Sequence, residues 1–186
     1  KKNQIKTFRG SENNVLKRIY TAAKKFRADA IVQVSGDSPL TDINLITRWI
    51  KIFKRNNIDI ISELWGYFPS GITAPIIKVN ALKESLKKTR NKSDLEHVTK
   101  FIFSNPKLFK IYLDKPSKKE SYPELNLCID EKSDYELVNR IIKKNIKKNL
   151  NSINLINYIK KNKNLLKINR KVNRKSKKYH EKFFKK

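Results

Sequence analysis

Asp37 follows a short apolar segment at a position where chemistry could take place. The apolar residues 30–34 lead into Gly36, and Pro39 follows the aspartate. Gly36 permits a close turn of the backbone, and Pro39 stiffens the exit from it. This arrangement would offer the Asp37 carboxylate to a crevice. Asp37 could also serve as an N-cap or form an Asx turn before the following helix, and the spacing leaves these readings open.

Asp130 stands in a similar position further along the chain, after the apolar residues 125–129 and before a helical pattern. Alone, it could simply cap that helix. Side chains at the carboxyl ends of strands in an α/β sheet face the same ligand crevice. Mg²⁺ prefers oxygen ligands and commonly uses one or two carboxylates together with substrate phosphates. The pair therefore predicts a shared Mg²⁺ site and metal-assisted phosphoryl or nucleotidyl chemistry.

The elements that must position these aspartates alternate along the chain. Helix, strand, helix and strand in succession predict an α/β unit with a parallel sheet. Apolar residues at helical spacing predict helices at 14–26, 42–55, 79–89, 95–104, 131–145 and 153–159. Ser11 is the predicted N-cap of the first of these helices. Short apolar runs predict strands at 30–34, 58–61, 74–77, 109–113 and 125–129.

The length of 186 residues fits one domain, which we place at 1–160, followed by a basic C-terminal arm at 161–186. A single cysteine, Cys128, excludes an intramolecular disulfide framework and a multi-cysteine zinc site, which suits a reducing compartment. No apolar run is long enough for a membrane span, and residues 1–4 show no start of a signal peptide. We therefore expect a cytoplasmic protein. Cys128 and Trp49 are expected to pack in the core.

The formal net charge of +27 suggests a nucleic-acid partner, because clustered Lys and Arg gain affinity by releasing phosphate counterions. However, the lysines are spread over helix faces among Asn and Ile, as an AT-rich genome would impose on exposed positions. Only residues 167–186 are dense enough to form a basic tail. We expect no specific nucleic-acid site. The alternative function is a non-catalytic binding or dimerisation module that uses the C-terminal arm on nucleic acid or an anionic surface.

Four segments in order resemble the cytidylyltransferases of the spore-coat polysaccharide type, relatives of the acylneuraminate and 3-deoxy-manno-octulosonate cytidylyltransferases. They are FRGSENNVL at 8–16, VSGDSPL at 34–40, EHVT at 96–99 and ID at 129–130. The resemblance covers roughly residues 7–145, with a weaker echo at 167–173. It implies a three-layer α/β/α, Rossmann-like domain of the nucleotide-diphospho-sugar transferase type, with a mostly parallel sheet.

The resemblance also implies a reaction in surface polysaccharide biosynthesis. A sugar-acid hydroxyl attacks the α-phosphate of CTP, pyrophosphate leaves, and a CMP-sugar forms. Asp37 and Asp130 match the family's catalytic, metal-binding carboxylates and would hold Mg²⁺. The implied substrate-binding residues are Arg9, Ser38, Glu96 and His97, and a homodimer is compatible with the family. A surface or interface role for His97 stays open.

Two departures from the family pattern affect this expectation. Relatives begin with a strand and a phosphate-cradling loop, and none of the four glycines here can form that loop. The resemblance thus predicts an N-terminally truncated domain that lacks the first strands and is weak or inactive as it stands. Relatives also carry acidic residues on the sugar side, where this chain has SGITAP at 70–75. The usual sugar recognition is therefore in doubt.

Overall fold

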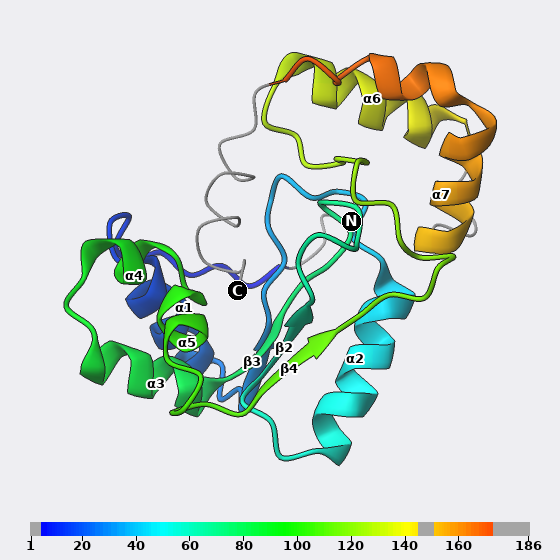
Figure 1. Ribbon diagram of the computed structural model, residues 1–186. Helices are drawn as coiled ribbons and strands as arrows, with labels where there is room; N and C mark the ends of the chain where they lie inside the picture. Colours follow the sequence, from blue (N-terminus) through cyan, green and yellow to red (C-terminus); the bar gives the residue numbers. More distant parts are fainter. Residues whose placement is uncertain (1–4, 145–150, 173–186) are drawn as a thin grey trace.

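A computed structural model describes residues 5–144 and 151–172 of the chain. Figure 1 shows a sheet with helices on both sides. The helices are α1 (Val15–Lys25), α2 (Ile43–Arg55), α3 (Val79–Lys88), α4 (Lys92–Glu96), α5 (Lys100–Ser104), α6 (Lys132–Lys143), α7 (Ser152–Lys161) and the 3₁₀ turn η2 (Lys163–Lys167). The strands are β1 (Ala30–Val32), β2 (Ile60–Glu63), β3 (Ile76–Lys78) and β4 (Ile111–Asp114).

The described residues form one mixed sheet with the strand order β1-β3-β2-β4. Strand β3 pairs antiparallel with both β1 and β2, and β2 pairs parallel with β4. Strands β1, β2 and β4 thus share one direction, and β3 alone opposes them. The predicted α/β class is confirmed. The expected parallel pairing of the first two strands is wrong, because β3 lies between them.

Two apolar clusters cover the two faces of the sheet, as the alternation of side chains along a strand requires. Ile61 and Ile76 pack with residues of α2, α6 and α7. Ile60 and Ile77 pack on the opposite face with residues of α1, α3 and α5. Trp49 of α2 is 0% exposed, which confirms its predicted place in the core. The arrangement is the expected three-layer α/β/α domain.

Two predicted elements differ in the structure. Residues 125–129 are not a strand: Leu125 and Leu127 are buried, but the only ladder contact in this described stretch is an isolated bridge between Ser70 and Asn126. The alternating pattern thus reflects burial against a loop. The helix expected at 95–104 is split into α4 and α5, because His97 leaves helical geometry at φ −100° and ψ 94°.

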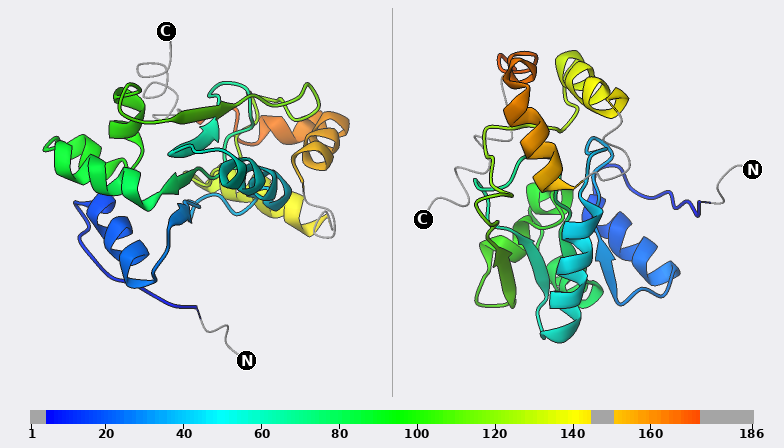
Figure 2. Two further views of the ribbon diagram at one scale, coloured as in Figure 1. Left: turned by 90° about the horizontal axis from the view of Figure 1, so that it is seen from below. Right: turned by 90° about the vertical axis from the view of Figure 1, so that its right-hand side faces the viewer.

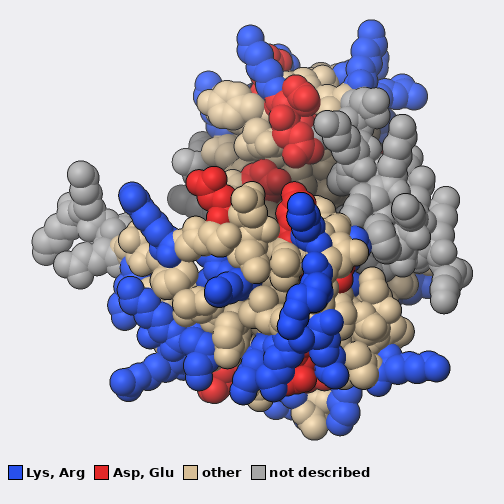
Figure 3. Space-filling model, turned by 90° about the vertical axis from the view of Figure 1, so that its left-hand side faces the viewer, with Lys and Arg blue, Asp and Glu red and all other residues tan. Residues whose placement is uncertain are grey.

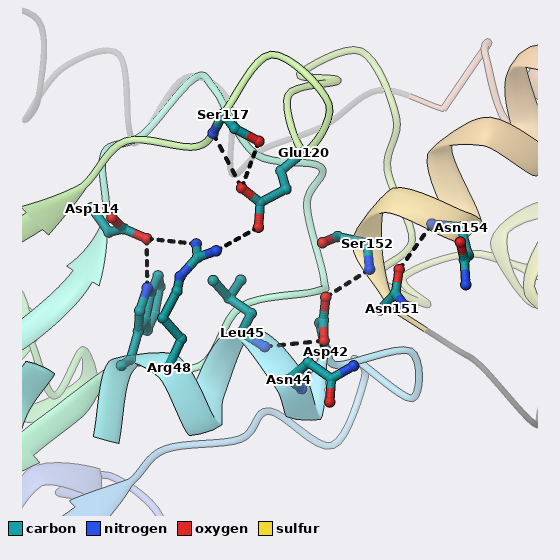
Figure 4. Close-up of polar contacts among 11 residues, drawn as sticks. Asp42, Asn44, Leu45, Arg48, Asp114, Ser117, Glu120, Asn151, Ser152 and Asn154 are labelled. Atoms are coloured by element: carbon teal, nitrogen blue, oxygen red, sulfur yellow. Dashed lines mark hydrogen bonds and ion pairs between the residues drawn. The ribbon is translucent and has the colours of Figure 1, made fainter. Parts of the chain in front are cut away.

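A single buried carboxylate joins the starts of two helices (Figure 4). Asp42 is the N-cap of α2, where it accepts hydrogen bonds from the backbone N–H groups of Asn44 at 2.9 Å and Leu45 at 3.1 Å. Its second oxygen accepts a 2.6 Å hydrogen bond from the backbone N–H of Ser152, the first residue of α7. Asp42 is 3% exposed. It therefore fixes α7 against α2 across 110 positions of sequence.

Helix α2 is also bound to the end of β4. The Arg48 guanidinium donates to Asp114 at 3.1 Å and to Glu120 at 2.7 Å, and Trp49 Nε1 donates to the same Asp114 oxygen at 2.6 Å (Figure 4). These contacts hold the segment after β4 over the carboxyl end of the sheet.

The cap of α1 is Asn14, while the predicted cap, Ser11, accepts a 3.1 Å bond from the Asn14 N–H.

Helices α6 and α7 lie beyond the carboxyl ends of β2 and β4 (Figures 1 and 2). Leu165 of η2 is buried in the cluster with α7, and Asn169 is 8% exposed.

The domain boundary that we placed at residue 160 stays a prediction. Residues 173–186, most of the dense basic tail, lie outside the described residues. No helix among the described ranges is long and apolar enough to cross a membrane.

Candidate functional site

A cavity of about 700 Å³ opens at the carboxyl ends of β1 and β2. Its lining includes Val15, Val98 and Phe103, which belong to the apolar cluster on the α1 side of the sheet or pack against it. The polar part of the wall contains Gln33, Ser35, Ser38, Ser62, Glu63, Ser70, Thr73, Glu96, His97, Thr99, Lys100, Ser104 and Cys128. Acidic side chains gather in the recessed middle of one face of the molecule, with Lys and Arg around its lower part (Figure 3).

Asp37 lies five positions beyond β1, exposed on a loop whose turn is closed by backbone hydrogen bonds. Its carboxylate accepts a 3.0 Å hydrogen bond from the hydroxyl of Ser38, which is 7% exposed and lines the cavity. Asp42, not Asp37, caps the following helix. The helix-cap interpretation of Asp37 is therefore wrong, and its carboxylate stays at the surface beside the cavity wall.

Asp130 is exposed on the turn before α6. The N-cap of α6 is Glu131, so Asp130 is not the cap either. Asp134, which is 0% exposed, accepts hydrogen bonds from the backbone N–H groups of Asp130 at 3.2 Å and Glu131 at 3.0 Å. Asn169 donates to the other Asp134 oxygen at 2.8 Å. Asp134 thus positions the turn that carries Asp130, a role that the sequence pattern did not reveal.

The segments that carry the two aspartates lie against each other. The backbone N–H of Ile129 donates to the carbonyl oxygen of Asp37 at 2.8 Å. Between them, the thiol of Cys128 lies 3.7 Å from the Ser38 hydroxyl and 3.4 Å from that of Ser70. Burial raises the pKa of this thiol, and the charges of Asp37 and Asp130 raise it further. Both carboxylates therefore act on the same sulfur, which lines the cavity beside two hydroxyls.

A glycine brings the loop at 70–73 against the Cys128 segment. Ser70 accepts a 2.9 Å backbone hydrogen bond from Leu127 and donates one of 3.0 Å to Leu125. Gly71 has a φ of +88°, and a Cβ there would lie 2.8 Å from the Cys128 nitrogen. Glycine alone fits both the backbone conformation and the space. This contact builds one wall of the cavity.

Three of the four expected substrate-binding residues line the cavity together. Ser38 comes from the loop after β1, while Glu96 and His97 come from the break between α4 and α5. Both of the latter are exposed. Arg9 is exposed in the segment before α1 and is not part of this lining. The substrate-binding roles of all four residues stay predictions.

Glu63 is a further cavity residue that sequence reasoning missed. It ends β2 and is half-buried, and the Thr73 hydroxyl donates a hydrogen bond to its carboxylate. Burial raises the pKa of Glu63 to about 7, against the lowering effect of Thr73. An acid at a strand end gives no signal of such burial in the sequence, because the residues that cover it come from other elements.

The donor set fits a Mg²⁺ ion that is completed by substrate. No group of three or more His, Cys, Asp and Glu side chains suited to a metal occurs in the described ranges. Asp37 and Asp130, which are not part of the cavity lining, stay a predicted two-carboxylate site on adjacent segments. Such a pair suits Mg²⁺, which takes one or two carboxylates and fills its remaining positions with water and phosphate oxygens.

Comparison with known proteins identifies the family. A family model described as cytidylyltransferase matches residues 2–163. The chain belongs to the cytidylyltransferase family. A cytidylyltransferase from Leptospira borgpetersenii has a similar structure, with a TM-score of 0.84, 27% sequence identity, and coverage of 93% of this chain and 73% of that one. The expected family and its α/β fold are thereby confirmed.

Two curated relatives extend this comparison. An uncharacterized protein of Methanocaldococcus jannaschii is 33% identical over 172 residues, which cover 92% of this chain and 70% of that protein. The spore coat polysaccharide biosynthesis protein SpsF of Bacillus subtilis is 29% identical over 145 residues, which cover 77% of this chain and 59% of that protein. This member of the cytidylyltransferase family thus matches only part of each relative's length.

Proposed function

We propose that this chain transfers CMP from CTP to a sugar acid in the biosynthesis of a surface polysaccharide, with Mg²⁺ held by Asp37 and Asp130. The family supports cytidylyl chemistry. The observation that carries the proposal is the 2.8 Å hydrogen bond from the Ile129 N–H to the Asp37 carbonyl, which sets the two aspartate-bearing segments side by side at the cavity. CTP is a cytoplasmic metabolite, so we place the reaction in the cytoplasm.

In this reaction the acceptor hydroxyl gives up its proton to solvent and its oxygen forms a bond to the α-phosphorus, while the bond from that phosphorus to the bridging oxygen breaks and pyrophosphate leaves with that electron pair. Bound Mg²⁺ would neutralise charge that develops on the phosphate oxygens. Ser38 orients the Asp37 carboxylate through its 3.0 Å hydrogen bond. Glu96 and His97, which line the cavity, would orient the acceptor.

The two aspartates can be tested through Mg²⁺-dependent CTP binding, measured by calorimetry, and pyrophosphate release in the presence of a sugar acid. Asp37→Asn and Asp130→Asn keep the side-chain shape and remove the charge. Each should lower Mg²⁺-dependent turnover on the order of a hundredfold and weaken CTP binding only when Mg²⁺ is present.

Asp29→Asn is the matched control, because Asp29 is exposed just before β1, at the opposite end of the same strand. This variant should leave both the Mg²⁺-dependent CTP binding and the pyrophosphate release unchanged. Wild-type Mg²⁺ dependence in either Asp37→Asn or Asp130→Asn would contradict the proposal. A loss in Asp29→Asn equal to theirs would show that the effect is one of general charge.

A further inference from the structure

The wall of the cavity formed by β2 and the segment before β3 carries a carboxyl group that lacks a positive partner. Glu63 lines the cavity, and the Thr73 hydroxyl donates to its Oε2 atom. None of the ion pairs among the described residues reaches Glu63. A carboxylate removed from water without a cation or several donors is costly, and structures usually pair it.

A buried acceptor without a donor among the described residues also lines this cavity. Gln33 Oε1 is buried and has no hydrogen-bond partner among the described residues. The backbone N–H of Gln33 donates to the Pro75 carbonyl at 2.9 Å, two positions from Thr73. Gln33, Thr73 and Glu63 therefore come from the extensions of three neighbouring strands, with the Thr73 segment between the other two. Buried polar atoms without partners are rare, and each calls for an explanation.

No ion pair within the described ranges joins a cationic side chain of the cavity to Glu63. Lys100 lines the cavity, but its ammonium donates to Ser93 at 2.7 Å and pairs with Asp94 at 3.7 Å. His97 is exposed at the break between α4 and α5. The other titratable groups of the lining are Glu96 and Cys128, neither of which is a cation. A ligand that carries a positive charge would therefore complete what the described residues provide at Glu63.

We propose that Glu63 and Gln33 form a subsite for a protonated amine on the acceptor, so that the sugar activated by this protein is an amino sugar. This inference rests on the proposed cytidylyl transfer. An ammonium group carries three N–H donors and no acceptor. It offers separate N–H groups for the Glu63 carboxylate and for Gln33 Oε1, and its bond to the carboxylate is the charge-assisted kind, about twice as strong as a neutral one. A hydroxyl group offers a single donor and no charge.

The test uses the wild-type chain with isotope labelling and follows the signals of the Gln33 side-chain amide and the Glu63 carboxyl by NMR. The probes are aminohexoses with the amine at carbon 2, 3 or 6, each compared with D-glucose near pH 7, where amine and carboxyl can both be charged. We expect at least one aminohexose to bind about tenfold more tightly than D-glucose, to shift both signals, and to lower the pKa of Glu63. Equal affinity for D-glucose, or shifts elsewhere in the molecule, would overturn the proposal.

Two variants locate the effect. Glu63→Gln keeps the shape and can still accept from Thr73, but it removes the charge, so the preference for the amine should fall to less than about twofold. Gln33→Leu should reduce the preference by a smaller factor. Glu136→Gln, on an exposed position of α6, should preserve the full preference. Circular dichroism checks that each variant is folded, and the wild-type comparison of amine with hydroxyl stands without any variant.

Sugar binding is measured here without CTP or metal, so this inference and the proposed function can fail separately. Loss of the amine preference together with intact Mg²⁺-dependent CTP turnover would overturn only the amino-sugar subsite. An amine preference that depends on Glu63, in a chain with no Mg²⁺-dependent CTP binding, would uphold the subsite as an amine site and contradict cytidylyl transfer.

Discussion

The Glu63 carboxyl group should make the stability of the chain depend on pH. Its ordinary pKa is 4.5, and burial raises it to about 7 in the folded chain. Between these values the folded chain binds more protons at this group than the unfolded chain does. The free energy of unfolding therefore falls as pH rises through this window, and the loss is complete above pH 7.

Glu63→Gln removes this loss while keeping an acceptor for Thr73. We expect the variant to match the wild type near pH 4 and to be more stable by about 2 kcal/mol near pH 8, which allows for the partial exposure of the group. Urea unfolding at several pH values measures the difference. A constant difference across this range would show that Glu63 does not titrate as the cavity geometry indicates.

At the same scale, the local sequence pattern indicated the two aspartates, whose metal-binding role stays a prediction, but not the groups that position them. Asp37 and Asp130 follow apolar runs, and this local pattern is readable without a structure. Asp134 accepts local N–H bonds from the turn before its helix, but its contact with Asn169, like the contact of Glu63 with Thr73, joins separate elements. These longer-range contacts are set by tertiary packing, so no local pattern could show them. Arg9 was predicted to bind substrate from the family resemblance alone, and it is not part of the cavity lining.

At the scale of elements, Asp42 should contribute more than an ordinary helix cap. It accepts hydrogen bonds from two N–H groups of α2 and one of α7. We expect Asp42→Ala to lower the free energy of unfolding by about 3 kcal/mol, against about 1 kcal/mol for Asn14→Ala, whose side chain accepts a single N–H bond at the start of α1. Chemical denaturation measures both. A loss no larger than that of Asn14→Ala would contradict the joining role of Asp42.

The loop at 70–73 offers a second test at this scale. Gly71→Ala forces a side chain into a left-handed backbone and against the Cys128 nitrogen, so we expect a loss of about 2 kcal/mol or more. Gly36→Ala is the matched control, because a Cβ there meets nothing within 4 Å, and it should change stability by less than about 0.5 kcal/mol. Similar losses in thermal unfolding would show that the close contact at Gly71 does not constrain the loop.

Helices could be predicted where apolar residues recur strongly at helical spacing. The pairing of the strands in the sheet could not be predicted. The periods of α1, α2 and α6 show in the sequence because one face of each helix is buried. Residues 125–129 alternate as a strand would, yet they run beside the loop at Ser70. The insertion of β3 between β1 and β2 depends on which apolar faces meet in the fold. No short segment carries that information.

At the scale of the whole molecule, the net charge of +27 should act as a diffuse surface property. Lys and Arg lie along both the upper and the lower edges of one face, around a recessed middle where acidic side chains gather (Figure 3). Filter binding to nucleic acids of different sequence should show weak affinity that is the same for each and falls steeply as salt rises. Tight binding to a single sequence that survives added salt would contradict this expectation.

The shared metal site is the central claim, and the position of a bound ion tests it most directly. Mn²⁺ can stand in for Mg²⁺ and broadens the NMR signals of nearby amides. With Mn²⁺ and CTP present, we predict that the amide signals of Asp37, Ile129 and Asp130 broaden together, that Asp29 stays sharp, and that Asp37→Asn or Asp130→Asn abolishes the effect. Broadening centred elsewhere, or broadening that persists in both variants, would contradict a metal held by these two aspartates.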